Sequence, residues 1–67
     1  TVNVLYDAKL GIKNIGVYNI IGKMVNIYKV SANSAVLNID DLPSGIYFLR
    51  LYNTQGKVVA TRKITHQ

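Results

Sequence analysis

The sequence has no cysteine and no glutamate, only one proline and one histidine, and just three acidic residues, all aspartate. Without cysteine, neither disulfide bonds nor a zinc–cysteine site can stabilise the fold. No apolar run approaches the roughly 20 residues that a membrane-spanning helix needs. The 67 residues must therefore be held together by side-chain packing, and a chain this short buries only about 60% of its unfolded surface.

Positive charge dominates, because eight basic residues face three acidic ones and give a net charge of +5. This balance suits nucleic acid, an anionic membrane surface or an acidic partner. The lysines are spread along the chain, however, which favours a β-domain whose solvent-facing lysines also block unwanted strand pairing. We therefore expect no nucleic-acid partner.

Groups able to perform catalysis are scarce. His66 is the second-last residue, at a position where a chain usually frays and a catalytic base is poorly held. Asp40 and Asp41 are adjacent, so on a strand they would point to opposite faces, and they suit a turn better than an acid–base pair. The two aspartates also supply too few of the roughly six to eight oxygen ligands that calcium needs. We expect no catalytic residue, no metal site and no cofactor.

What the chain has in quantity is valine, isoleucine, leucine and tyrosine in short runs separated by turn residues. These residue types suit a pleated sheet, and no segment has a long helical period. Six short strands are expected, over residues 2–6, 13–18, 23–30, 36–39, 46–52 and 57–65. The pattern predicts an all-β sandwich made of one domain, residues 1–67, cut from a larger protein.

Alternation within the strand at 46–52 predicts which face is buried. Tyr47, Leu49 and Leu51 share one face, and Arg50 on the other marks that face as partly wet. By the same argument the other core residues are Ile15 with Val17, Val25 with Ile27, Leu37 with Ile39, and Leu42 beneath the turn at Pro43. The second face carries Phe48, Arg50 and Tyr52, which we interpret as half-buried sheet packing in preference to a base-stacking platform.

An internal repeat stands out. Residues 18–25 read YNIIGKMV and residues 52–59 read YNTQGKVV, with tyrosine, asparagine, glycine, lysine and valine at matching places. An asparagine in the first turn position bonds the backbone two residues on, and a glycine can adopt positive φ cheaply. We expect two similar hairpin turns, with Asn19 and Gly22 in one and Asn53 and Gly56 in the other.

The segment 42–51, LPSGIYFLRL, follows an acidic turn and resembles the central motif of the type IX secretion system C-terminal sorting domain. The segment 17–25 is similar to that family's earlier hairpin, and 53–57 to its later one. The run RKI at 62–64 resembles its basic-apolar terminal motif. The motifs occur in the family's order and cover nearly the whole chain.

The resemblance implies an immunoglobulin-like antiparallel β-sandwich of about six to seven short strands, fused behind an N-terminal cargo domain. It implies a signal that directs cargo across the outer membrane, through the periplasm to the cell surface or the medium. The implied partners are the outer-membrane secretion machinery and a sortase-like peptidase that later removes the domain. By matching position, the sorting motifs are carried by Gly45, Tyr47, Lys63 and Ile64.

The sequence leaves two questions open, one about function and one about assembly. The alternative function is that of an accessory immunoglobulin-like module that binds carbohydrate or mediates adhesion, and such a module would need an exposed aromatic platform. The question of assembly concerns the last expected strand, which presents an edge. A receptor strand, or a second copy of the chain in a homodimer, could pair with that edge.

Overall fold

The computed structural model describes residues 2–30 and 34–67, and this part of the chain is almost wholly β-structure. In it, six strands and one short 3-10 helix follow in the order β1 (Val2–Leu5), η1 (Ala8–Leu10), β2 (Ile12–Asn19), β3 (Met24–Lys29), β4 (Ser34–Leu37), β5 (Gly45–Asn53) and β6 (Val58–His66). Every strand pairing is antiparallel. The predicted all-β, immunoglobulin-like sandwich is confirmed.

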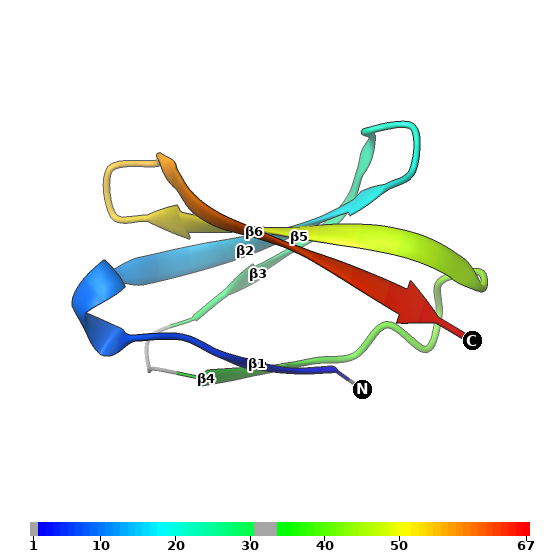
Figure 1. Cartoon of the computed structure of the whole chain (residues 1–67), viewed down its shortest axis with the longest axis horizontal. Helices are drawn as coiled ribbons and strands as arrows, with labels where there is room; N and C mark the ends of the chain where they lie inside the picture. The colour runs from blue at the N-terminus through cyan, green and yellow to red at the C-terminus, as the bar shows by residue number, and fades with distance from the viewer. Residues whose placement is uncertain (1, 31–33) are drawn as a thin grey trace.

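The strands lie in two layers (Figure 1). The larger sheet has the order β3-β2-β5-β6, and the smaller one pairs β1 with β4. The β2–β3 and β5–β6 turns both rise from the larger sheet on the side away from β1 and β4 (Figure 1). We call the sheet surface between these two turns the outer face. Its floor is formed by Gly16, Tyr18, Phe48, Arg50 and Tyr52.

The core lies between the layers, and β5 shows why these residues form it. Tyr47, Leu49 and Leu51 point inward and are 6%, 1% and 0% exposed, as predicted. The residues between them, Phe48 and Arg50, are only half-buried or exposed. The two-residue alternation of a strand thus separates the core from the outer face along the whole of β5.

The other predicted core residues are confirmed with one exception. Ile15, Val17, Leu37 and Ile39 are buried, and Leu42 is half-buried against the core. Val4, Tyr6 and Ile12 are buried as well.

Ile27 was predicted to lie in the core with Val25, and this prediction is wrong, because Ile27 is 51% exposed. The register of β3 explains the error. Val17 pairs with Asn26 and Tyr18 with Met24, so Val25 is the extra residue of a bulge. A bulge shifts the alternation by one residue. Val25 therefore packs against the core, while Ile27, opposite Gly16, lies on the outer face.

Strand ends differ modestly from expectation. The strand expected at residues 36–39 is β4, which the structure has at Ser34–Leu37, so residues 38 and 39 lie beyond its end. The link between the first two expected strands contains η1, whose first turn is capped by the Asp7 carboxylate accepting from the Lys9 amide at 2.9 Å. His66, expected to fray, is the last residue of β6 and pairs with Gly45.

Candidate functional site

Gly45 is the first residue of β5, and its backbone has a conformation that other residue types adopt only under strain. Its φ is +153°, which is the region that glycine alone reaches readily. A methyl group built on its Cα meets no atom within 4 Å among the described residues, so space is not the constraint. The glycine of the LPSG run is therefore required by the sharp entry of the chain from the Pro43 loop into the sheet.

Tyr47 holds that same loop in place from inside the core. Its hydroxyl donates a hydrogen bond of 2.6 Å to the carbonyl oxygen of Pro43, and its ring is buried. Upstream in the loop, the Leu42 amide donates to the Ile39 carbonyl at 2.9 Å. A buried tyrosine that binds its own chain four residues back fixes the path of the loop, since its hydroxyl has found a partner inside the protein.

The two sorting motifs predicted from the sequence meet across one ladder. In the β5–β6 pairing Gly45 lies opposite His66, Tyr47 opposite Ile64, and Phe48 opposite Lys63. Ile64 is half-buried and packs against the core, whereas Lys63 is exposed. The structure therefore brings Gly45, Tyr47, Lys63 and Ile64 together at one end of β5 and β6, although 16 to 19 positions separate the two motifs in the sequence.

Among the described strands, β6 has β5 as its one neighbour in the sheet and is therefore an edge strand. One side of its backbone therefore presents amide and carbonyl groups that another strand can pair with. Two of its exposed residues are basic, Arg62 and Lys63. Arg62 pairs with the inward-facing Leu49 and is nevertheless exposed, as an edge position allows.

The β2–β3 turn has the geometry of an asparagine-anchored hairpin. The Asn19 side-chain oxygen accepts from the Ile21 amide at 3.2 Å and from the Lys23 amide at 2.9 Å. Gly22 has φ +86° and donates its amide to the Asn19 carbonyl at 3.0 Å. Asn19 also pairs with Tyr47, so this turn lies at the same end of the sheet as the sorting motifs.

The β5–β6 turn repeats this geometry at the opposite end. The Asn53 side-chain oxygen accepts from the Gln55 and Lys57 amides at 2.9 and 3.0 Å. Gly56 has φ +79° and bonds back to the Asn53 carbonyl at 3.0 Å. The two copies of the sequence repeat thus form equivalent turns, and only the first of them adjoins the sorting motifs.

The outer face carries a side-chain cluster of which the sequence indicated only Arg50 and Tyr52, as residues of one face. The hydroxyls of Tyr18 and Tyr52, the first residues of the two repeat copies, hydrogen-bond to each other. Their rings lie over Gly16, where an added Cβ would stand 2.9 Å from the Tyr18 ring and 3.2 Å from the Tyr52 ring. The Arg50 guanidinium carbon lies 4.5 Å from the centre of the Tyr18 ring, at cation–π distance.

The environment of Tyr18 favours its neutral form. The hydrogen bond with Tyr52, and then burial, raise the pKa of Tyr18 above its ordinary value, with Arg50 acting in the opposite direction. The matching place of the two tyrosines in the repeat was the sequence feature that could have indicated their contact. Gly16 gave no such indication, since its role depends on rings contributed by two strands.

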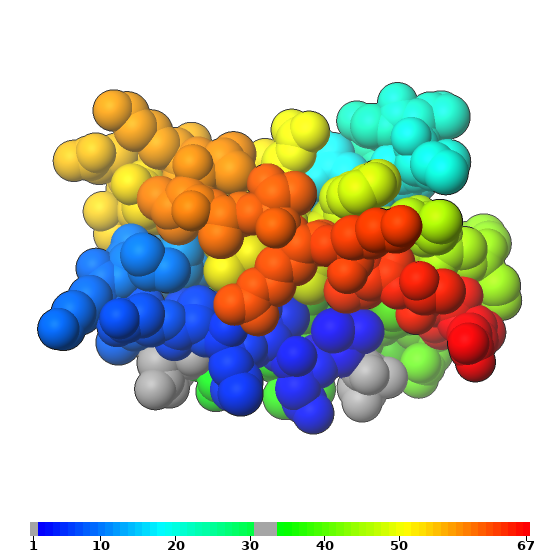
Figure 2. All heavy atoms as spheres, viewed as in Figure 1, coloured from blue at the N-terminus to red at the C-terminus, as the bar shows by residue number. Residues whose placement is uncertain are grey.

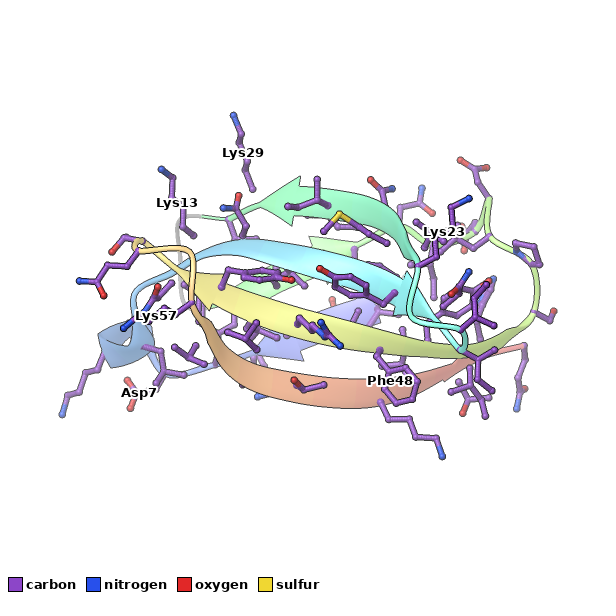
Figure 3. All side chains as sticks on the ribbon, turned by 90° about the horizontal axis from the view of Figure 1, so that it is seen from above. Asp7, Lys13, Lys23, Lys29, Phe48 and Lys57 are labelled. Carbon is purple, nitrogen blue, oxygen red and sulfur yellow. The ribbon has the colours of Figure 1, made fainter. Side chains whose placement is uncertain are left out.

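A cavity of about 250 Å³ opens on the outer face beside this cluster. One wall is the β2–β3 turn, with Ile20 and Gly22, and the other lining residues are Tyr18, Asn19, Phe48, Arg50 and Thr61. In Figure 2 the two turns stand as separate projections, one cyan and one orange, with lower surface between them. Figure 3 looks down on this surface and shows Phe48 on the sheet, with Lys23 near the first turn.

The described residues contain no group of three or more histidine, cysteine, aspartate or glutamate side chains placed to hold a metal ion. Within the same residues, no helix has the length and apolar character to span a membrane. The site therefore consists of a strand edge with two exposed basic residues and an outer face with exposed apolar side chains.

Comparison with known proteins identifies the family of the chain. A family model described as the secretion system C-terminal sorting domain matches residues 1–67, the whole chain. No curated protein matches, and neither does any solved structure. Because this match covers the whole chain, the chain belongs to the C-terminal sorting domains that mark proteins for export by the type IX secretion system.

Proposed function

We propose that the export machinery reads the end of the β5–β6 ladder where Lys63 and Ile64 lie opposite Phe48 and Tyr47. The observation that carries this proposal is the cross-strand pairing itself, because it joins the central and terminal motifs into one surface. A signal of this kind is a folded patch, because the antiparallel register of β5 and β6 brings together two motifs that are distant in the chain.

The four motif residues divide into two roles. Gly45, Tyr47 and Ile64 act through the fold: the first by its backbone, the second by its bond to Pro43, and the third by packing against the core. Lys63 is exposed, so it is available for direct contact with a partner. Substitutions at the first three should lower stability, whereas a change at Lys63 should leave stability intact.

The mode of contact that fits an edge strand is strand addition. A receptor strand that pairs with β6 gains main-chain hydrogen bonds along its length, and Arg62 and Lys63 select for acidic side chains on that strand. Hydrogen bonds between backbones supply affinity without regard to sequence, so the two basic residues supply the specificity.

The same edge bears on self-association. In a symmetric antiparallel pair of β6 strands, Arg62 and Lys63 of one copy would lie near those of the other. Like charges placed opposite each other across a ladder are destabilising. These charges oppose the homodimer that the open strand edge predicts. Sedimentation over a range of protein concentrations would detect such a dimer as a rise in apparent mass.

The fate of the domain follows from its role as a signal. A cargo domain precedes it, the fusion passes through the periplasm, and the secretion machinery of the outer membrane binds the domain. A sortase-like peptidase then removes the domain while the cargo is anchored or released. The domain itself acts as substrate and signal and performs no chemistry.

The test is a reporter protein fused to this chain in a host that has a type IX secretion system. Lys63→Glu should abolish surface delivery while thermal unfolding is unchanged. Lys57→Glu is the matched control, because Lys57 is an exposed lysine just before the first residue of β6, far from Lys63, and the change in charge is the same. Equal delivery of the two variants would overturn the proposal.

A further inference from the structure

The outer face carries a second recognition feature, separate from the β6 edge. Its cavity of about 250 Å³ is smaller than the roughly 300–1,000 Å³ of a typical small-molecule site. Two of its walls, Ile20 and Phe48, are apolar, and the exposed Arg50 stands beside them. A space of this size and composition suits one large apolar side chain next to a carboxylate.

Apolar surface continues around the cavity. Ile20 and Ile21 at the tip of the β2–β3 turn are 69% and 82% exposed. Met24 and Ile27 on β3 are also exposed, and the β3 register puts both on the outer face. Contiguous exposed apolar surface of this kind marks an interaction site more often than isolated exposed residues do.

The charge of this sheet restricts the partner. The four strands of the larger sheet contain no acidic residue and five basic ones, Lys13, Lys29, Arg50, Arg62 and Lys63. The three aspartates lie elsewhere: Asp7 caps η1, and Asp40 and Asp41 belong to the loop before β5. Figure 3 shows Asp7 beside η1 at the periphery, with Lys13 and Lys29 along one edge of the sheet. A second copy of this chain, with its net charge of +5, would be repelled.

The position of the cargo leaves this face open. β1, at the start of the chain, lies in the smaller sheet, and the outer face is on the far side of the larger one (Figure 1). A cargo domain joined ahead of β1 therefore approaches the opposite layer.

Arg50 is held ready for a ligand. Its guanidinium lies against the Tyr18 ring, and the Tyr18–Tyr52 hydrogen bond holds that ring over Gly16. An arginine fixed in this way loses less conformational freedom on binding than a free one.

We propose that the outer face binds an acidic, apolar segment of a partner protein, with one large apolar side chain in the cavity and an adjacent carboxylate on Arg50. The identity of that partner as a component of the export machinery rests on the proposed function, whereas the binding chemistry does not. The outer face and the β6 edge adjoin at Phe48 and Lys63, so one partner can contact both.

The first test is direct binding to the 67-residue chain, followed by backbone amide chemical shifts. The probes are two acetylated pentapeptides, Glu-Leu-Glu-Leu-Glu and Lys-Leu-Lys-Leu-Lys. We expect only the acidic probe to shift amides around Phe48, Arg50 and Thr61. Arg50→Gln should weaken that binding about tenfold, and Lys9→Gln on η1 is the matched control. Shifts confined to the β6 edge, equal responses to both probes, or no response would overturn the proposal.

A second variant is needed because Arg50→Gln could weaken binding indirectly, by disturbing the Tyr18 ring that the guanidinium contacts. Thr61 is exposed, lines the cavity and pairs with Arg50, so Thr61→Glu should occupy the guanidinium and abolish probe binding. Vesicles of anionic lipid serve as a further probe: if they bind tightly through Arg50 while the peptide does not, the occupant is a membrane surface and the proposal fails.

Export measurements separate this inference from the proposed function. If the wild-type fusion is delivered and both Arg50→Gln and Thr61→Glu are delivered equally well, the partner of the outer face is not part of the export machinery, and the sorting function stands. If the Lys63→Glu fusion is delivered as well as wild type while the acidic peptide still binds Arg50, the β6-edge proposal fails and the binding chemistry stands.

Discussion

Tyr47 and Ile64 face each other across the β5–β6 ladder, and each packs into the same core. One belongs to the central motif and the other to the terminal motif. Their contact means that a change in either motif alters the fold beneath the other. Loss of export after a substitution in one of the motifs therefore has to be compared with a measurement of stability before it is assigned to recognition.

Tyr47→Phe should destabilise the domain by about 1 kcal/mol, because the Pro43 carbonyl loses its hydrogen bond to the tyrosine hydroxyl. Urea unfolding followed by circular dichroism measures the change. Tyr6→Phe is the matched control: the Tyr6 hydroxyl is buried and has no hydrogen-bond partner among the described residues. Removing that hydroxyl should raise stability by up to about 1 kcal/mol. Equal losses in the two variants would show that the Pro43 bond contributes nothing specific.

Gly45→Ala should cost about 1–3 kcal/mol, since alanine at φ +153° is strained although its methyl group meets no neighbour. Ser44→Ala, one residue earlier and exposed, is the control and should be nearly neutral. Thermal unfolding of both variants distinguishes a backbone requirement at position 45 from general sensitivity of the loop.

Gly16→Ala should destabilise by about 1–3 kcal/mol, because the new methyl group would push against the Tyr18 and Tyr52 rings. In a chain that already carries Tyr18→Ala, the same substitution should cost much less, because the nearer of the two rings is gone. A double-mutant cycle of unfolding free energies measures this coupling. An equal cost in both backgrounds would mean that the rings do not rest on Gly16.

Alkaline pH should weaken the fold. Burial raises the pKa of Tyr6, and the Tyr52 hydrogen bond raises that of Tyr18, both above the ordinary tyrosine value near 10. The unfolded chain then loses these two protons at lower pH than the folded chain does. Their contribution to stability is complete below pH 10 and is lost as the pH rises through the folded-state pKa values. Urea unfolding near pH 8 and near pH 11 should show the loss, and the double variant Tyr6→Phe, Tyr18→Phe should show a smaller one.

Much of the fold could be predicted from the sequence because it rests on local chemistry. Alternation within a strand was enough to identify Tyr47, Leu49 and Leu51 as core residues, and the Asn–Gly turns were readable from their residue types. Ile27 was misassigned because a bulge depends on the pairing of two strands, which alternation within one strand does not contain.

The arrangement of the site was only half accessible to sequence reasoning. Resemblance to a family indicated Gly45, Tyr47, Lys63 and Ile64, but their meeting across one ladder depends on the register of β5 with β6. The tyrosine pair over Gly16 depends in the same way on the register of β2 with β5. The residue pattern within one strand does not determine its register with another strand, so it cannot predict contacts between strands that are distant in the sequence.

The central claim is that Ile64 serves export through the fold and Lys63 through contact. The most direct measurement is the export efficiency of Ile64→Ala and Lys63→Glu fusions, each with and without the stabilising Tyr6→Phe. Ile64→Ala should lose roughly 1–3 kcal/mol of stability, and Tyr6→Phe should restore part of its export. The same addition should leave Lys63→Glu unexported. Rescue of Lys63→Glu, or no rescue of Ile64→Ala once its stability has recovered, would contradict this account.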